Sequence, residues 1–190
     1  MKRFDFKEIL EITFRLYVFF FLTAYGLGKV IGGQFYTAAR MPDGLDLMPI
    51  GQVSDFDLAW IFMGRSYGYT LFIGFAEILG AVLLLSNKTK LIGTLILIPI
   101  MVNVIVFDIF FLDEYGALAG ATLYLFMLFA ILFINKEKMI AIFNDVINNK
   151  KLPKTSSKEK IYKYLIVAAI IVLIFIGDQL IVNFLGYGKG

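Results

Sequence analysis

Five long apolar stretches constrain this chain more than any other feature of its sequence. They cover approximately residues 9–31, 67–85, 91–112, 117–134 and 164–185. A helix needs about 20 mostly apolar residues to cross the hydrocarbon core of a bilayer, and each stretch is close to that length. Only 17% of the residues are charged, against about 25% in soluble domains. The sequence therefore predicts an all-α, polytopic membrane protein with five transmembrane helices.

The spacing of these stretches divides the chain into three parts. Residues 1–135 hold four spans and predict a transmembrane four-helix bundle, with a long connection over 32–66 between the first two spans. Residues 136–160 form a loop that begins with an amphipathic stretch, in which Ile140, Phe143 and Ile147 recur at helical spacing. This pattern favours a helix lying on the membrane surface. Residues 161–190 hold the fifth, C-terminal transmembrane helix.

The distribution of basic residues predicts the orientation of the spans. Lysines and arginines gather before the first span, between the second and third, and between the fourth and fifth, whereas the opposite side is rich in acids. Basic loops stay in the cytoplasm, so we expect a cytoplasmic N-terminus and an external C-terminus in a bacterial cytoplasmic membrane. Glu11 and Arg15 within the first apolar stretch favour a membrane anchor over a cleaved signal peptide. The pI of about 9.0 thus reflects topology and predicts no nucleic-acid partner.

Two absent residue types limit the chemistry of the chain. It has no Cys, which excludes thiol relays and iron–sulfur ligation, and no His, which removes the commonest ligand for zinc and haem. No metal site or self-contained active site is predicted, so an enzymatic role would at most be that of a membrane subunit.

Polar residues within the predicted spans mark two candidate clusters. Ionisable side chains are costly in a bilayer, so they face the protein interior and pair. Arg15 and Glu77 have similar predicted depths, and the small residues near Glu77 let another helix approach closely. We expect these two to pair, with Asn103 as an uncharged companion, as a candidate site or as a purely structural pair. Lys29, Asp108 and Asp178 share outer-leaflet depth and predict a second cluster.

The connection over 32–66 contains an apolar segment, residues 56–63, that is too short to span the membrane. It predicts a short interfacial helix with Trp60 at headgroup depth. One interpretation is a lid over the bundle, formed by Phe56, Trp60 and Phe62. The other is a loop that simply packs on the bundle.

Two short motifs resemble the DoxX family of small membrane proteins. The first is Tyr25-Gly26-Leu27-Gly28-Lys29, which follows Arg15, and the second is the glycine-flanked Glu77 with its leucine run and the basic turn 87–90. The resemblance covers residues 9–135. It implies a four-helix membrane bundle similar to that of vitamin K epoxide reductase, and a relation to the DoxD-type membrane subunit of thiosulfate:quinone oxidoreductase. The lack of Cys departs from the thiol-dependent relatives.

Two functional hypotheses follow from the residues and this resemblance. In the first, the chain is a redox-associated membrane subunit that docks a cofactor-carrying membrane or periplasmic partner. It carries no cofactor itself, and a quinone or lipid is the candidate ligand of the bundle. In the second, it is a non-enzymatic membrane component that binds lipid or stabilises a larger complex. Co-purification of a quinone or a redox enzyme would separate the two.

Overall fold

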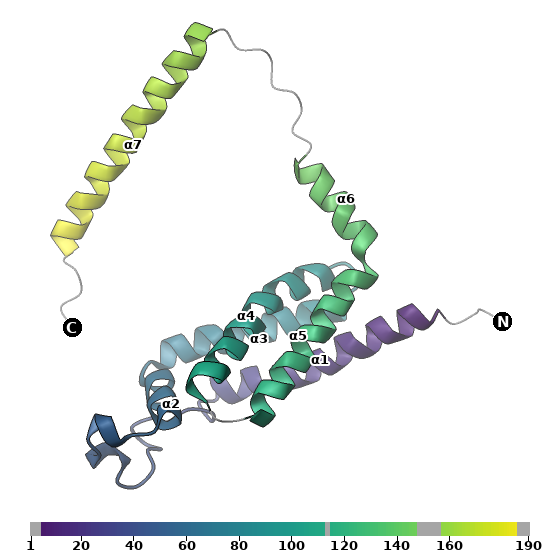
Figure 1. Cartoon of the computed structure of the whole chain (residues 1–190), viewed down its shortest axis with the longest axis vertical. Coiled ribbons are helices and arrows are strands. Elements are labelled where there is room, and N and C mark those ends of the chain that lie inside the picture. The colour runs from purple at the N-terminus through teal and green to yellow at the C-terminus, as the bar shows by residue number, and fades with distance from the viewer. Residues whose placement is uncertain (1–4, 113–114, 148–156, 186–190) are drawn as a thin grey trace. The chain divides into compact units, whose positions relative to one another are not determined.

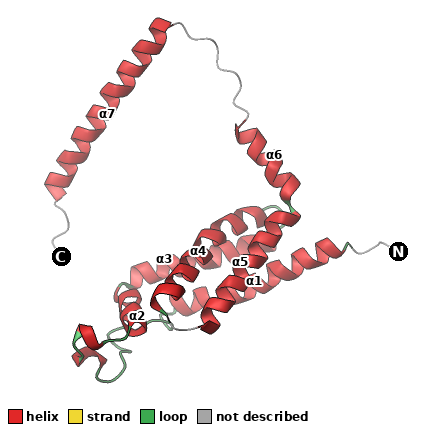
Figure 2. Cartoon of the chain, viewed as in Figure 1, coloured by secondary structure: helices red, strands yellow, loops and turns green. Residues whose placement is uncertain are grey.

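The computed structural model describes residues 5–112, 115–147 and 157–185, and every regular element in these ranges is helical (Figure 2). The chain forms two compact units, residues 1–142 and 143–190, and each is described by itself. The elements are α1 (Phe6–Val30), η1 (Leu45–Leu47), η2 (Ile50–Gln52), α2 (Asp55–Arg65), α3 (Tyr67–Leu85), α4 (Lys90–Phe111), α5 (Tyr115–Ile134), α6 (Lys136–Ile147) and α7 (Ser157–Leu185).

Five of these helices are long and apolar enough to cross a membrane: α1, α3, α4, α5 and, over Glu159–Ile181, α7. They coincide with the five apolar stretches of the sequence, and the prediction of an all-helical protein with five candidate spans is confirmed. The division of the chain into parts at residues 135 and 160 stays a prediction.

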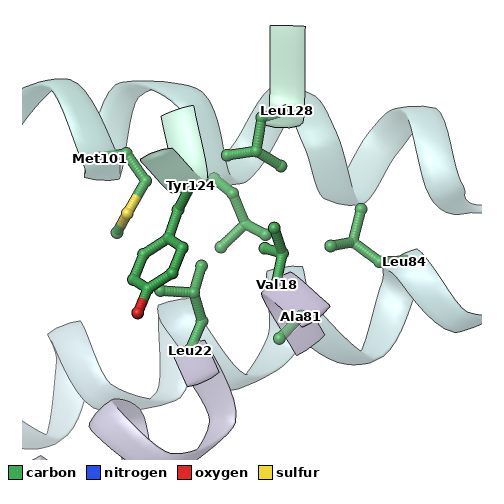
Figure 3. Close-up of a cluster of buried hydrophobic side chains, with 8 residues drawn as sticks. Val18, Leu22, Ala81, Leu84, Met101, Tyr124 and Leu128 are labelled. Atoms are coloured by element: carbon green, nitrogen blue, oxygen red, sulfur yellow. The ribbon is translucent and has the colours of Figure 1, made fainter. Parts of the chain in front are cut away.

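The first unit is a bundle in which α1, α3, α4 and α5 run side by side (Figure 1). Helix α1 packs against α3 and α5, and α4 packs between α3 and α5 in the same way. The bundle interior is filled by apolar side chains from all four helices (Figure 3). The core residues are Val18, Leu22, Ala81, Leu84, Leu97, Met101, Tyr124 and Leu128. Large apolar side chains such as Phe20, Phe75 and Phe126 are exposed on the outer flank, where lipid covers a spanning helix.

The two ends of the bundle differ in how the chain connects its helices. At one end, which we call the loop end, residues 31–54 and α2 follow α1 (Figure 1). At the other, the turn end, residues 86–89 join α3 directly to α4. Successive helices of the bundle therefore run in opposite directions between these two ends.

Helix α1 stops at the loop end because two glycines close it. Gly32 has a φ of 73°, a left-handed conformation that favours glycine. The N–H of Gly32 donates to the carbonyl of Lys29, and the N–H of Gly33 donates to that of Gly28. This is the Schellman pattern of helix termination. Lys29 is thereby fixed in the last turn of α1.

A close approach of backbones joins α1 to α3 one turn before Lys29. A Cβ added at Gly26 would lie 2.8 Å from the carbonyl oxygen of Gly74, and a Cβ at Gly74 would lie 2.8 Å from that of Gly26. Side chains larger than hydrogen would force these helices apart. The crossing brings Lys29 on α1 against Glu77 on α3.

Helices α6 and α7 complete the described part of the chain. Helix α6 covers the stretch in which an amphipathic helix was predicted, and Ile140, Phe143 and Ile147 are all exposed on it. Its helical structure is confirmed, while its placement on a membrane surface stays a prediction. Helix α7 belongs to the second unit, and the large apolar side chains of its span are exposed within that unit.

Candidate functional site

Arg15 lies at the turn end of the bundle and does not pair with Glu77. Its Nε donates to the carbonyl oxygen of Leu84, and its Nη2 donates to that of Leu85 at 2.7 Å. Its Nη1 donates to Asn87 Oδ1 at 2.6 Å and lies 3.4 Å from Glu11 Oε1. The last carbonyls of a helix lack partners within it and carry partial negative charge, so a guanidinium satisfies both needs. Arg15 therefore caps the C-terminus of α3.

The buried carboxylate of Glu11 extends this network to α4 and α5. Lys90 Nζ donates to Glu11 Oε1, and Asn135 Nδ2 donates to Glu11 Oε2 at 3.1 Å. Glu11, Arg15, Asn87, Lys90 and Asn135 together form the turn-end cluster. Each of its charges has an opposite charge or a hydrogen-bond partner from the protein.

The predicted Arg15–Glu77 pair is wrong because the two helices are offset along their axes. Arg15 is level with the end of α3, where it contacts Leu85. Glu77 lies about 12 Å of helix away from Leu85, at a rise of about 1.5 Å per residue. Counting residues from the cytoplasmic end of each predicted span gave similar depths, but α1 begins beyond the end of α3.

Glu77 instead binds Lys29. Lys29 Nζ donates to Glu77 Oε1 at 3.0 Å and to Oε2 at 2.8 Å, and the side chains are only 8% and 1% exposed. The sequence placed this lysine in a cluster with Asp108 and Asp178 and did not predict Glu77 as its partner. The lysine turns inward because α1 ends opposite the middle of α3, where the nearest partner for its charge is Glu77 rather than water.

Asp108 on α4 lies beside this pair and is 5% exposed. Its Oδ2 is buried and has no hydrogen-bond partner in the described structure, and the same is true of Gln34 Oε1. Buried polar atoms without partners are uncommon and costly. Lys29, Glu77 and Asp108 form the loop-end cluster, which carries one positive and two negative charges when all three residues are ionised.

Two cavities border the loop-end cluster and share part of their lining. The chamber, of about 100 Å³, lies among α1, α3, α4 and α5, and its lining includes Tyr25, Glu77 and Tyr124. The groove, of about 670 Å³, lies between α3 and α4, and its lining includes Phe72 and Pro99. The linings of both cavities share Lys29, Gln34, Trp60, Val104, Asp108 and Leu112. A molecule in the groove can therefore place its end against the charged cluster.

Helix α2 supplies Trp60 to both cavities. The Trp60 ring stacks on Phe56 with centroids 4.2 Å apart, and its edge meets Phe35 at 5.5 Å. Ser54 caps the helix by accepting from the N–H of Asp57 at 3.1 Å. The prediction of a short helix around Trp60 is confirmed, and its role as a lid stays a prediction.

The chain before α2 is held tightly against that helix. A Cβ on Gly64 would lie 1.7 Å from the carbonyl oxygen of Tyr36, so only glycine permits this contact. Burial, together with the charge and a hydrogen bond of the Asp57 carboxylate, raises the pKa of the Tyr36 phenol above 10. These contacts hold the backbone at Tyr36 against α2.

The remaining predicted residues are distributed among different places. Asn103 lines the groove and is exposed, away from Arg15. Phe62 also lines the groove and is 68% exposed. Asp178 lies on α7, in the second unit, where it is exposed. Lys29 and Asp108 line the same cavities, as their shared depth suggested. Gln34 was not predicted to belong to the site. The available signal was the Gly32–Gly33 pair before it, which ends α1 and brings the next residue to the cavities.

The described structure contains no group of three or more acidic side chains that could hold a metal ion, and the chain has no Cys or His. Five candidate spans, four of them packed as a bundle with charged residues at both ends of its interior and a groove on its flank, define an integral membrane protein.

Comparison with known proteins gives the family of the chain. The chain is similar to a Bacillus subtilis (strain 168) protein described as uncharacterized protein YwoB, with 36% identity over 137 residues. The aligned region covers 72% of this chain and 84% of the relative. The chain belongs to the YwoB family. No protein-family model matches it, so the DoxX resemblance gains no support, and no solved structure matches it either.

Proposed function

We propose that this protein binds an amphipathic molecule of the bilayer, with its apolar body in the groove and its polar end at the loop-end cluster. The observation that carries the proposal is the position of buried charges beside a cavity on the flank of the bundle. At about 670 Å³, the groove falls within the range of small-molecule sites, roughly 300–1,000 Å³.

The flank position favours entry of the ligand from the membrane. Phe72 is 70% exposed at the groove, and the side chains around it are largely apolar. On a spanning helix such a surface faces lipid, so a membrane-dissolved molecule reaches the groove without crossing water. The ligand is thus a quinone or a lipid rather than a water-soluble metabolite.

In the redox form of this proposal the ligand is a quinone, and a cofactor-carrying partner docks on the bundle. The support is the resemblance to DoxX proteins together with the chemistry of the cluster, since Lys29, Glu77 and Asp108 can donate and accept protons at a quinone oxygen. The electron carrier would belong to the partner.

A second candidate is a non-enzymatic component that holds a lipid within a larger membrane complex. Its support is α7, a candidate span in the second unit that adds a further apolar helix to the four spans of the bundle. Its apolar surface is suited to lipid or to another membrane subunit.

Trp60 provides the test, because it is the chain's single tryptophan and lines both cavities. Purified protein in detergent is titrated with a short-chain benzoquinone and, separately, with a phospholipid brominated in its acyl chain. We expect saturable quenching of Trp60 fluorescence by the ligand that binds. Quenching by the quinone alone favours the redox form, and quenching by the lipid alone favours the second candidate.

A groove-filling variant controls for nonspecific partition. Ala76→Phe places a ring in the groove, whereas Ala119→Phe makes the same change at an exposed position of α5 outside its lining. We expect Ala76→Phe to weaken binding by about tenfold or more, since a filled site loses more than about 1.4 kcal/mol of contacts. Linear quenching that is identical in all three proteins would overturn the proposal.

We also propose the orientation with a cytoplasmic N-terminus in a bacterial cytoplasmic membrane. It is supported by the basic residues at the turn end and in α6, including Lys88, Lys90 and Lys136. A reporter fused after residue 156 should be active only as a cytoplasmic enzyme, and one fused after residue 190 only as an external enzyme. The same location for both fusions would refute the five-span topology.

A further inference from the structure

The charges around the cavities do not balance. Among the described residues that line the chamber and groove, those that carry charge are Lys29, Glu77 and Asp108. Glu77 uses both of its oxygens on Lys29, so this pair is matched in charge and in hydrogen bonds. Asp108 is left with one negative charge and a buried Oδ2 that no donor of the described residues reaches.

A second acceptor without a partner lines the same two cavities. Gln34 Oε1 is buried and receives no hydrogen bond in the described structure. Two unsatisfied acceptors, one of them anionic, are complementary to a group that carries hydrogen-bond donors and positive charge.

Aromatic rings surround this position. Tyr25 and Tyr124 line the chamber, and Trp60 lines both cavities. Lys29 Nζ already lies 6.0 Å from the centroid of the Tyr25 ring. Ring faces attract cations, and a carboxylate among several rings is an arrangement that suits an organic ammonium group.

The size of the chamber limits the group that enters it. A water molecule takes up about 30 Å³ in the liquid, so about 100 Å³ accommodates three or so groups of that size. An ammonium with one or two carbons fits, while the remaining chain extends into the groove.

We infer that the polar end of the ligand is an ammonium group, which donates to Asp108 and Gln34 while its hydrocarbon chain occupies the groove. This inference rests on the proposed binding of an amphipathic molecule and adds its chemical class. The headgroup of an aminolipid and a free alkylamine share this chemistry.

Three probes with the same chain and different head charge test the inference. They are terminally brominated undecylammonium, undecanol and undecanoate, and the bromine quenches Trp60 when the chain lies in the groove. The full chain in a neutral detergent is titrated with each. We expect the ammonium to bind about tenfold or more tightly than the alcohol, because a hydrogen bond between two charged groups is stronger than one to a neutral hydroxyl. The carboxylate should bind most weakly.

Asp108→Asn removes the charge and keeps the size of the side chain. We expect it to abolish the ammonium preference by lowering the affinity for the ammonium about tenfold or more, with a smaller loss for the alcohol, since the contacts of the hydrocarbon chain in the groove are kept. Asp43→Asn removes the same charge at an exposed position outside both linings and should keep the preference. Brominated phospholipids with ethanolamine and with glycerol headgroups then separate a lipid source from a free amine.

The outcomes distinguish this inference from the proposed function. Saturable binding of all three probes with equal affinity, or a preference that survives Asp108→Asn, would overturn the ammonium assignment and leave the proposed function standing. If no probe quenches Trp60 saturably, and quenching in Ala76→Phe is the same as in the wild type, both the ammonium assignment and the proposed function are overturned. If Asp43→Asn loses the preference for the ammonium probe just as Asp108→Asn does, the preference reflects the net charge of the protein. That result would also overturn the ammonium assignment.

Discussion

The two ends of the bundle place a buried basic side chain of α1 against α3, yet they use it differently. At the turn end, Arg15 donates to the carbonyls of Leu84 and Leu85 and to Asn87. At the loop end, Lys29 binds Glu77, and Asp108 remains beside them with an unpartnered oxygen. The turn-end cluster is complete without a ligand, whereas the loop-end cluster lacks a donor.

This difference shows why a buried charge alone does not identify a functional site. Arg15 is 5% exposed and Asp108 is also 5% exposed, so burial does not separate them. What separates them is whether the protein supplies all of their partners and whether a cavity adjoins them. An unsatisfied buried acceptor costs stability, and proteins accept such costs where binding requires them.

The largest expected effect is loss of stability when the turn-end cluster is broken. Arg15→Gln strands the carbonyls of Leu84 and Leu85 and the Asn87 oxygen, at about 1–3 kcal/mol for each buried acceptor. Because the glutamine amide replaces part of this bonding, we expect a net loss of about 3–5 kcal/mol, measured by thermal unfolding in detergent. Ligand quenching of Trp60 in the folded fraction should be unchanged. A stable variant that lost binding instead would reverse the roles of the two ends.

A smaller loss is expected at the loop end. Lys29→Met leaves Glu77 buried without its partner, and the carboxyl can take up a proton, so the cost is that of an unsatisfied neutral group, about 1–3 kcal/mol. The double variant Lys29→Met/Glu77→Met removes both groups and should be more stable than Lys29→Met alone. Thermal unfolding of the wild type, both single variants and the double variant forms the required cycle. If the losses of the single variants simply add, Lys29 and Glu77 are not coupled.

The smallest effect on stability is expected for Asp108→Asn. Oδ2 of Asp108 has no hydrogen-bond partner to lose among the residues that the structure describes, and a neutral amide is less costly to bury than a carboxylate. Its unfolding free energy should therefore stay within about 1 kcal/mol of the wild type or rise slightly. The same thermal measurement decides the point. A loss as large as that of Arg15→Gln would show that Asp108 is structural and would remove the contrast between the two ends.

Much of the fold was predictable from local features of the sequence. Apolar length gave the five candidate spans, and the amphipathic stretch around Phe143 gave α6. The apolar segment around Trp60 gave α2, because it was too short to span. These features depend on neighbouring residues along the chain, and helix formation in a bilayer follows from them, since each backbone group must find its hydrogen bond within its own helix.

The residues of the candidate site were predictable only in part. The cost of burying charge correctly indicated that Lys29, Glu77 and Asp108 face protein, and the shared depth of Lys29 and Asp108 indicated one cluster. The choice of partner for Glu77 was wrong. Depth counted along separate helices carries no information about how far one helix is displaced along another.

The sequence by itself determined that this protein spans a membrane and that charged side chains of the bundle spans such as Arg15, Lys29 and Glu77 face protein, because lipid tolerates neither open backbone nor isolated charge. Only the tertiary structure decided which charges meet. The Gly32–Gly33 termination of α1 and the close contact of Gly26 with Gly74 set the axial offset between α1 and α3. That offset assigns Arg15 to the end of α3 and Lys29 to Glu77. It depends on packing between residues 48 positions apart, which no local pattern encodes.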